Sequence, residues 1–348
     1  MDPETKTFTK SDTLTAKGVA ISLMFFYHLF HEAADVENLG VIFAPFSKEV
    51  FLMLSGFGNI CVAMFVFLSA YGISAKIREA GSGYFETGTA VKSTAKRLIS
   101  LMLRFVFVYL LINACLWMFF DYGNLYGTGF QGAVCTVTDM LGLAELFGTP
   151  TLNLTWWYMP LAYLIILMVP VLYRGAQKIK WLLLPLAMLL PLFLEMNTYY
   201  YMYICAAIWG VCAFSGDWNG RIREWKIPVW GKAVAFLLLM AICIPVRQNY
   251  LIRENYSYIT EGAVALVFCF GSAFLLSKIP VIGLILRFWG KHSMTMYLVH
   301  TFVYLTLFRG FTYSFRYSAL IWLVLMAVCT AFAVAADVLY DCLVKKFK

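Results

Sequence analysis

Charged residues are scarce in this chain. They make up 13% of its 348 residues, whereas a soluble domain usually carries about a quarter. Apolar residues reach 62% and occur in runs of the length, roughly 17–25 residues, that spans a bilayer. This composition excludes an ordinary soluble domain and predicts an all-α integral membrane protein.

Several motifs of soluble catalysis are also absent. The sequence has no P-loop, no G-x-S-x-G, no H-E-x-x-H and no glycine-rich dinucleotide fingerprint, so nucleotide hydrolysis and zinc chemistry are unsupported. Its nine cysteines form no C-x-x-C pair and have no metal-like spacing with histidine. Most of them lie in apolar runs, where cysteine is a packing residue. We therefore expect no metal site and no disulfide framework.

The apolar runs predict ten transmembrane helices. The fifth contains Pro185 and Pro191, which neighbouring helices must accommodate. Residues 280–289 are too short to span a bilayer and are expected to lie at the interface. The first run lacks a small-x-small cleavage site, so it is expected to be a retained helix. The expected spans are residues 16–31, 50–75, 97–120, 154–173, 181–196, 199–215, 229–246, 258–277, 292–309 and 317–343.

Basic residues fix the expected orientation. With the N-terminus inside, 21 of the 27 Lys and Arg residues fall on the cytoplasmic side, five fall outside, and Arg104 lies within a span. This bias favours cytoplasmic N- and C-termini. The net charge of +8 lies in short loops, so it does not indicate nucleic acid. The chain is expected to be one transmembrane domain, residues 1–348, with a cytoplasmic segment 1–15.

The longest expected extracytoplasmic loop covers residues 121–153. It is rich in glycine and contains an amphipathic stretch, residues 134–147. Such a stretch is typical of a helix that lies along the membrane surface.

The first helix carries the most informative ionisable groups. Lys17 and His28 are eleven residues apart, which places them on one helix face at roughly 16 Å axial separation. Glu32 continues this stripe one turn after His28, with His31 and Asp35 close beside it. A cation at the inner mouth can bind a cofactor's phosphates. A histidine further out can take a proton from a hydroxyl while a carboxylate fixes its tautomer.

A structural role for these residues remains open. His28 can instead form a hydrogen bond to a neighbouring helix, and Glu32 and His31 can be solvated at the helix end. Lys17 can be a topology anchor, and Arg104 can extend to the inner interface. The same two alternatives apply to His300, which has Tyr297 three residues before it. Two carboxylates in or near spans, Glu261 and Asp337, can be buried or interfacial.

Four stretches resemble the acyltransferase-3 family of bacterial membrane acyltransferases. The most specific is Gly290-Lys291-His292-Ser293 through Tyr297-Leu298-Val299-His300, which resembles the family's G-(K/R)-x-S-x-x-x-Y-L-x-H signature. Trp157-Tyr158 also resembles an aromatic element of the family. The other three stretches are Lys17-Gly18 through His28, Val66 through Gly72, and Lys96-Arg97-Leu98-Ile99.

The resemblance covers essentially the whole chain and implies an activity. The family takes acyl groups, usually acetyl, from cytoplasmic acyl-CoA and transfers them to a hydroxyl of a cell-envelope glycan or other surface molecule. By resemblance, His28 would be the catalytic histidine, with Glu32 beside it. Lys17, Lys96, Arg97 and Arg104 would contact the donor phosphates. The residues that would line or support the site are His31, Trp157, Tyr158, Ser293, Tyr297 and His300.

The chain departs from the family pattern at four places. Lys17 stands where the family usually has arginine, and a lysine cannot bind phosphate in a bidentate way. Leu14 replaces an acidic residue, Ser69-Ala70 replaces a Ser-Gly pair, and the basic segment at Lys96-Arg97 lacks the family's usual proline. No serine or cysteine is evidently paired with His28, which favours direct transfer over an acyl-enzyme. The expected partners are the lipid bilayer, acetyl-CoA or another acyl-CoA, and a glycan or small-molecule acceptor. The expected location is the bacterial cytoplasmic membrane.

Two other function classes remain open. A transporter or exporter of a glycan or lipid-linked intermediate would also use ten helices with buried ionisable groups. The sequence shows no inverted repeat, which weighs against it. A sensor or scaffold built on the same helices is the third possibility, because a fold does not guarantee an activity.

Overall fold

The computed structural model describes residues 8–31, 36, 38–86, 88–194 and 198–346. Within these ranges the secondary structure is helical, apart from one isolated β-bridge between Ile42 and Tyr317. The longer helices are α1 (Lys10–Phe30), α3 (Lys48–Phe57), α4 (Cys61–Glu79), α5 (Thr89–Leu116), α7 (Gly129–Met140), α9 (Tyr158–Ile179), α11 (Thr198–Ser215), α13 (Val229–Gln248), α14 (Tyr250–Leu276), α15 (Pro280–Thr301) and α17 (Ser318–Lys346). The short ones are α6 (Tyr122–Tyr126), α8 (Ala144–Phe147), α10 (Leu183–Leu189), α12 (Trp218–Glu224) and α16 (Arg309–Ser314).

Seven helical stretches of the described chain are long and apolar enough to cross a membrane. They confirm the predicted all-α, multi-pass class. Helix α11 adds a shorter apolar segment, Tyr200–Ser215, and the expected fifth span is broken into α10 with 3₁₀ turns on either side. The expected count of ten and the cytoplasmic termini stay predictions. The seven stretches are Lys10–Phe30, Lys48–Glu79, Thr89–Phe119, Leu154–Leu192, Val229–Gln248, Tyr250–Leu276 and Ser318–Val344.

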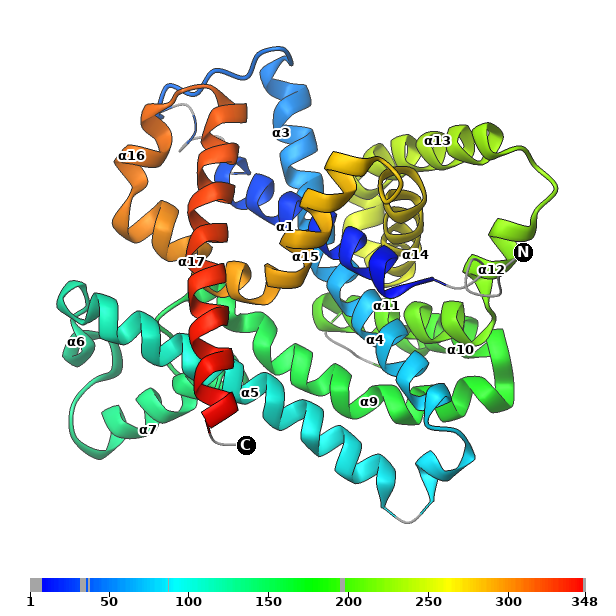
Figure 1. Cartoon of the computed structure of the whole chain (residues 1–348), viewed down its shortest axis with the longest axis horizontal. Coiled ribbons are helices and arrows are strands. Elements are labelled where there is room, and N and C mark those ends of the chain that lie inside the picture. Colours follow the sequence, from blue (N-terminus) through cyan, green and yellow to red (C-terminus); the bar gives the residue numbers. More distant parts are fainter. Residues whose placement is uncertain (1–7, 32–35, 37, 87, 195–197, 347–348) are drawn as a thin grey trace.

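Helices α1 and α15 form the closest pair of the bundle and cross near its centre (Figure 1). Two glycines of the family-like motifs make this approach possible. A Cβ atom on Gly18 would collide with the carbonyl of Leu286, and one on Gly290 would collide with the carbonyl of Leu14. Each motif therefore combines a glycine that allows backbone contact with a lysine next to it, and the contact brings Lys17 and Lys291 to the same end of the pair.

Helix α15 corrects one expectation from the sequence. Residues 280–289 were expected to form a separate interfacial piece, but they are the first half of one continuous helix, Pro280–Thr301. The break in the apolar run at Gly290, Lys291 and His292 is where α15 meets α1 and the cavity described below. A π-helical segment, η8 (Phe302–Leu307), follows directly.

The segment between α5 and α9 is held together by one buried carboxylate. Asp139 is 1% exposed and accepts hydrogen bonds from the Tyr126 hydroxyl at 2.6 Å, the Thr151 hydroxyl at 2.7 Å and the Leu152 amide at 2.7 Å. Burial raises the pKa of this carboxyl, against the opposing effect of the three hydrogen bonds. Helices α6 and α7 thus form one unit at an edge of the molecule (Figure 1).

Candidate active site

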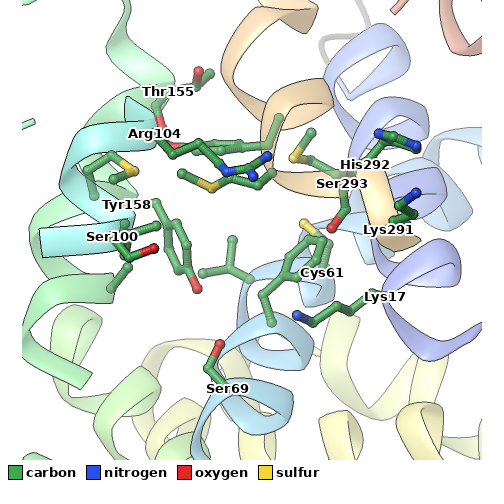
Figure 2. A pocket seen from close by; sticks show the side chains of 18 of the residues that line it. Lys17, Cys61, Ser69, Ser100, Arg104, Thr155, Tyr158, Lys291, His292 and Ser293 are labelled. Carbon is green, nitrogen blue, oxygen red and sulfur yellow. Dashed lines mark hydrogen bonds between the residues drawn. The ribbon is translucent and has the colours of Figure 1, made fainter. Parts of the chain in front are cut away.

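A cavity of about 990 Å³ lies between α1, α4, α5, α9, α15 and α17. Lys17 reaches into it from one side and Arg104 from the other (Figure 2). Nine of the residues proposed for the site from sequence line this cavity: Lys17, His28, Lys96, Arg97, Arg104, Trp157, Tyr158, Ser293 and Tyr297. The structure thus brings together side chains that are up to 280 positions apart in the sequence.

One end of the cavity is rich in cations; we call it the cation end. Phe8, just before α1, packs against Tyr71 with ring centroids 5.4 Å apart, so the start of α1 lies beside the last turns of α4. Lys76 pairs with Glu79 at 2.5 Å. For the others, no acceptor is found in the described part of the chain, and the Arg97 Nη1 atom is buried without a partner there. The cation end comprises Lys17, Lys76, Lys96, Arg97 and Lys291.

The opposite end holds His28; we call it the histidine end. The ring of His300 lies behind His28, with ring centroids 4.8 Å apart. His300 is 0% exposed, and its Nδ1 lies 2.6 Å from the Tyr297 carbonyl. Because a carbonyl only accepts, Nδ1 must carry the proton. The Nε2 atom is then a buried acceptor without a partner among the described residues, next to His28.

His31 and Glu32 were expected beside His28. His31 does not line the cavity; its ring stacks on Tyr27 with centroids 4.2 Å apart, and its Nδ1 lies 3.1 Å from the Tyr27 carbonyl. Its ring centroid is 6.2 Å from that of His28. Glu32 and Asp35 lie outside the described residues, so their predicted position is not assigned.

A 3₁₀ turn, η5 (Leu154–Trp157), lies across the histidine end and is bonded to α15. The Tyr297 hydroxyl donates to the Thr155 carbonyl at 2.5 Å, and the Trp156 indole donates to the Leu298 carbonyl at 3.2 Å. Immediately before η5, the Asn153 amide donates to the Thr301 hydroxyl. These bonds explain how Trp157 and Tyr158, at the end of η5 and the start of α9, come to face the cavity.

Arg104 differs from most members of the cation end, because it is paired with a carboxylate from another helix. Its Nη1 lies 2.7 Å from Oδ1 of Asp337 in α17. The second oxygen of Asp337 lies 2.6 Å from Nδ1 of His292, and Thr295 donates to Oδ1 at 2.6 Å. Sequence reasoning noted Asp337 as a buried or interfacial carboxylate and gave His292 no role.

Other lining residues were missed as well. Ser93 and Ser100 share a face of α5 with Lys96 and Arg97, at spacings of three, four and seven residues, a helical periodicity that could have been found. Asn59 and Cys61, at the break before α4, follow no such pattern. Glu261, also a candidate, lies elsewhere and forms a buried pair with Arg247 at 2.8 Å.

The cavity offers acid–base and anion-binding chemistry. No group of three or more His, Cys, Asp or Glu side chains suited to a metal occurs among the residues described. The unpaired cations can hold a polyanion, and a histidine with a second imidazole behind it can carry a proton. Cys61 is the one cysteine that lines the cavity, and no hydrogen bond joins it to His28.

Comparison with known proteins agrees with this geometry. The family model for the acyltransferase-3 family, described as an acyltransferase domain, matches residues 15–339. Searches of curated proteins and of solved structures found no match. The family match gives no support to the transporter alternative. Because the matched region covers nearly the whole chain and includes all the residues that line the cavity except Asp341, the chain belongs to the acyltransferase-3 family of membrane acyltransferases.

Proposed function

We propose that this protein is a membrane O-acyltransferase that moves an acyl group, acetyl in the simplest case, from cytoplasmic acyl-CoA to a hydroxyl of a cell-envelope glycan or related surface molecule. The observation that carries the proposal is that one cavity has cations without anionic partners among the described residues at one end and His28 at the other. The proposed location is the bacterial cytoplasmic membrane, with the cation end on the cytoplasmic side.

The donor would lie along the cavity. Its phosphates would contact Lys17, Lys96 and Arg97, which have no anionic partner among the described residues. Lysine binds phosphate as a point charge, and arginine adds a bidentate geometry. From Lys17 to His28 the helix rises roughly 16 Å, a distance that a pantetheine arm can cover. This arrangement would place the thioester beside His28.

The transfer step would use His28 as a general base. His28 removes the proton of the acceptor hydroxyl, and the oxygen attacks the thioester carbonyl to form a tetrahedral intermediate. The carbon–sulfur bond then breaks, the ester is released, and His28 returns the proton to the CoA sulfur. The ring of His300 lies next to that of His28, and its Nε2 has no hydrogen-bond partner among the described residues. A hydrogen bond from the His28 ring to this Nε2 would fix the tautomer of the base.

Direct transfer is part of the proposal. The cavity contains hydroxyls and one thiol, but none is bonded to His28 in the described structure. Ser293 donates instead to the Gly290 carbonyl at 3.0 Å. No hydrogen bond joins the Cys61 thiol to a basic side chain among the described residues. An acyl-enzyme would need such a pair.

The test is acetyl-CoA turnover by the purified protein in nanodiscs, measured as free CoA by chromatography. We expect wild type to release CoA, slowly without acceptor, and His28→Ala to release it about 10²–10⁴-fold more slowly. The matched control is His31→Ala, which removes a histidine one turn away that does not line the cavity; it should keep most of the activity. Full turnover by His28→Ala would refute the mechanism. A wild-type protein that neither binds nor consumes acyl-CoA would refute the donor.

A further inference from the structure

The half of α5 that carries Lys96 and Arg97 packs on the described part of the bundle only through half-buried apolar side chains: Ala90, Leu98, Leu101 and Met102. None of residues 89–104 is buried, whereas Phe105, Val108, Tyr109 and Ile112 in the second half are. No side chain of residues 89–103 forms a hydrogen bond or ion pair with another described residue. Among the described residues, apolar contacts therefore hold this half of α5, and its nearest polar attachment to another helix is at the junction with the second half.

Arg104 stands at that junction and binds α17. Besides the 2.7 Å ion pair with Asp337, its guanidinium carbon lies 4.7 Å above the ring of Tyr340, and Nη2 lies 3.9 Å from Asp341. One turn further along α5, Phe107 packs on the same Tyr340 ring with centroids 5.2 Å apart. Arg104 is the first side chain of α5 that has polar contacts with another helix.

Asp337 in turn is shared between three helices. Its two oxygens accept from Arg104 of α5 and from His292 and Thr295 of α15, all within 2.7 Å. The carboxylate is 13% exposed, and Arg104 is 30% exposed. A charged hydrogen bond with so little solvent contact is strong and geometrically restrictive. Asp337 thus connects α5, α15 and α17 at one point of the cavity wall.

We propose that Asp337 is a positioning residue for the donor site: through Arg104 it fixes the first half of α5, and thereby Lys96 and Arg97, at the cation end. This inference rests on the proposed function for its effect on catalysis. It also changes the role of Arg104. The resemblance implies that Arg104 contacts phosphate, whereas its charge is already neutralised by Asp337, in contrast to Lys17, Lys96 and Arg97.

The two possible roles of Arg104, tether or phosphate contact, predict different results in a double-mutant cycle with Asp337. If Asp337 and Arg104 act as one tether, Asp337→Asn and Arg104→Gln each raise the KM for acetyl-CoA by about five- to fiftyfold, and the double variant is no worse than either alone. Turnover at saturating donor stays near wild type, because Asp337 contacts α15 at His292, roughly 12 Å along the helix from His300 and its neighbour His28. If Arg104 binds phosphate directly, Arg104→Gln alone raises KM and Asp337→Asn does not, which would overturn the proposal.

A second measurement does not depend on catalysis. Hydrogen–deuterium exchange in nanodiscs should show faster exchange at residues 89–103 in Asp337→Asn, by about tenfold, with α1 and α4 unchanged. Asp337→Glu, which keeps the charge, should restore part of the protection. Asp341→Asn is the matched control: it removes the more exposed carboxylate one turn away and should leave α5 as in wild type.

The two measurements separate the two hypotheses. Faster exchange confined to α5, in a protein that does not consume acyl-CoA, would support the tether and refute the proposed function. Unchanged exchange at residues 89–103 in Asp337→Asn would overturn the tether, whatever the activity. Exchange that rises throughout the bundle would show that Asp337 only stabilises the fold, and would also overturn the positioning role.

Discussion

The two ends of the cavity are built on different physical principles. At the cation end, long side chains come from four helices and most of them have no partner in the described structure. At the histidine end, His28 lies against the fully buried His300, and η5 is held to α15 by direct hydrogen bonds. One end therefore acts through charge, which tolerates small displacements, and the other through short-range geometry, which does not.

This difference suggests a division of work that kinetics can separate. Charges that bind a donor equally in the ground and transition states affect KM, whereas a base that acts only during transfer affects kcat. We therefore expect substitutions at the cation end to change KM and substitutions at the histidine end to change kcat. The predictions that follow test this separation, beginning with the largest effect.

His28→Gln should show the largest change. Glutamine retains a polar side chain of similar length but cannot exchange a proton, so kcat should fall by about 10²–10⁴-fold. Donor affinity, measured by calorimetry in nanodiscs, should stay within a few-fold of wild type. A variant that loses donor binding together with kcat would break the proposed separation of the two ends.

Lys17→Ala should raise the KM for acetyl-CoA and leave kcat almost unchanged. A hydrogen bond to a charged group contributes about 1.5–3 kcal/mol, which corresponds to roughly 10- to 150-fold in affinity. Lys17→Arg is the matched control, since it keeps the charge and adds bidentate geometry; its KM should be close to that of wild type. If Lys17→Ala lowers kcat instead, Lys17 is part of the transfer step.

His300→Asn should lower kcat by about tenfold without a change in KM. The side chain lies behind His28 with its Nδ1 proton donated to the Tyr297 carbonyl, so its effect on the donor is indirect. Asparagine can preserve one polar contact but not the ring packing on Phe25, where the centroids are 5.3 Å apart. The check is the pH profile of kcat, which should shift in the variant; an unchanged profile would limit His300 to packing.

The sequence predicted much of the cation end because charge is visible without tertiary structure. Lysine and arginine at the ends of apolar runs stand out, and the spacing of Lys17 and His28 places both on one face of α1. Likewise the composition predicted an all-helical membrane protein, and the motif around Gly290 predicted the family. Each of these features depends on neighbours within one helix.

The tertiary contacts were not predictable in the same way. Arg104 and Asp337 are 233 positions apart, and Asn153 and Thr301 are 148 apart, so no local period connects them. The prediction divided helix α15 at residue 290 because residues 280–289 alone are too short to span a bilayer, whereas they continue through the polar residues at 290–292 into one helix. In the structure those residues face α1 and the cavity, where small and charged side chains are required.

The smallest expected effect concerns Asp139, which supports the histidine end at a distance. It accepts from Thr151 and from the Leu152 amide, directly before Asn153, whose amide donates to α15. Asp139→Ala would leave the Tyr126 hydroxyl and the Leu152 amide without their buried acceptor, at about 1–3 kcal/mol. Asparagine can accept both bonds with its oxygen and donate to Thr151 with its amide. At about pH 4 or below, where the buried carboxyl is protonated, Asp139→Asn should therefore stay within about 0.5 kcal/mol of wild type. Thermal unfolding in detergent measures both.

The pH dependence of thermal unfolding tests which protonation state of Asp139 stabilises the protein. Because burial raises the pKa of Asp139, the folded protein holds this proton more tightly than the unfolded chain does. The contribution of Asp139 to stability is therefore greatest below the unfolded pKa, about 4, and falls as pH rises through the higher folded value. Asp139→Asn should remove this fall, so the stability of the variant relative to that of wild type should increase as pH rises above 4. If instead the stability of wild type relative to the variant increases over that range, the three hydrogen bonds lower the pKa of Asp139 by more than burial raises it. The carboxylate would then stabilise the loop in its charged form.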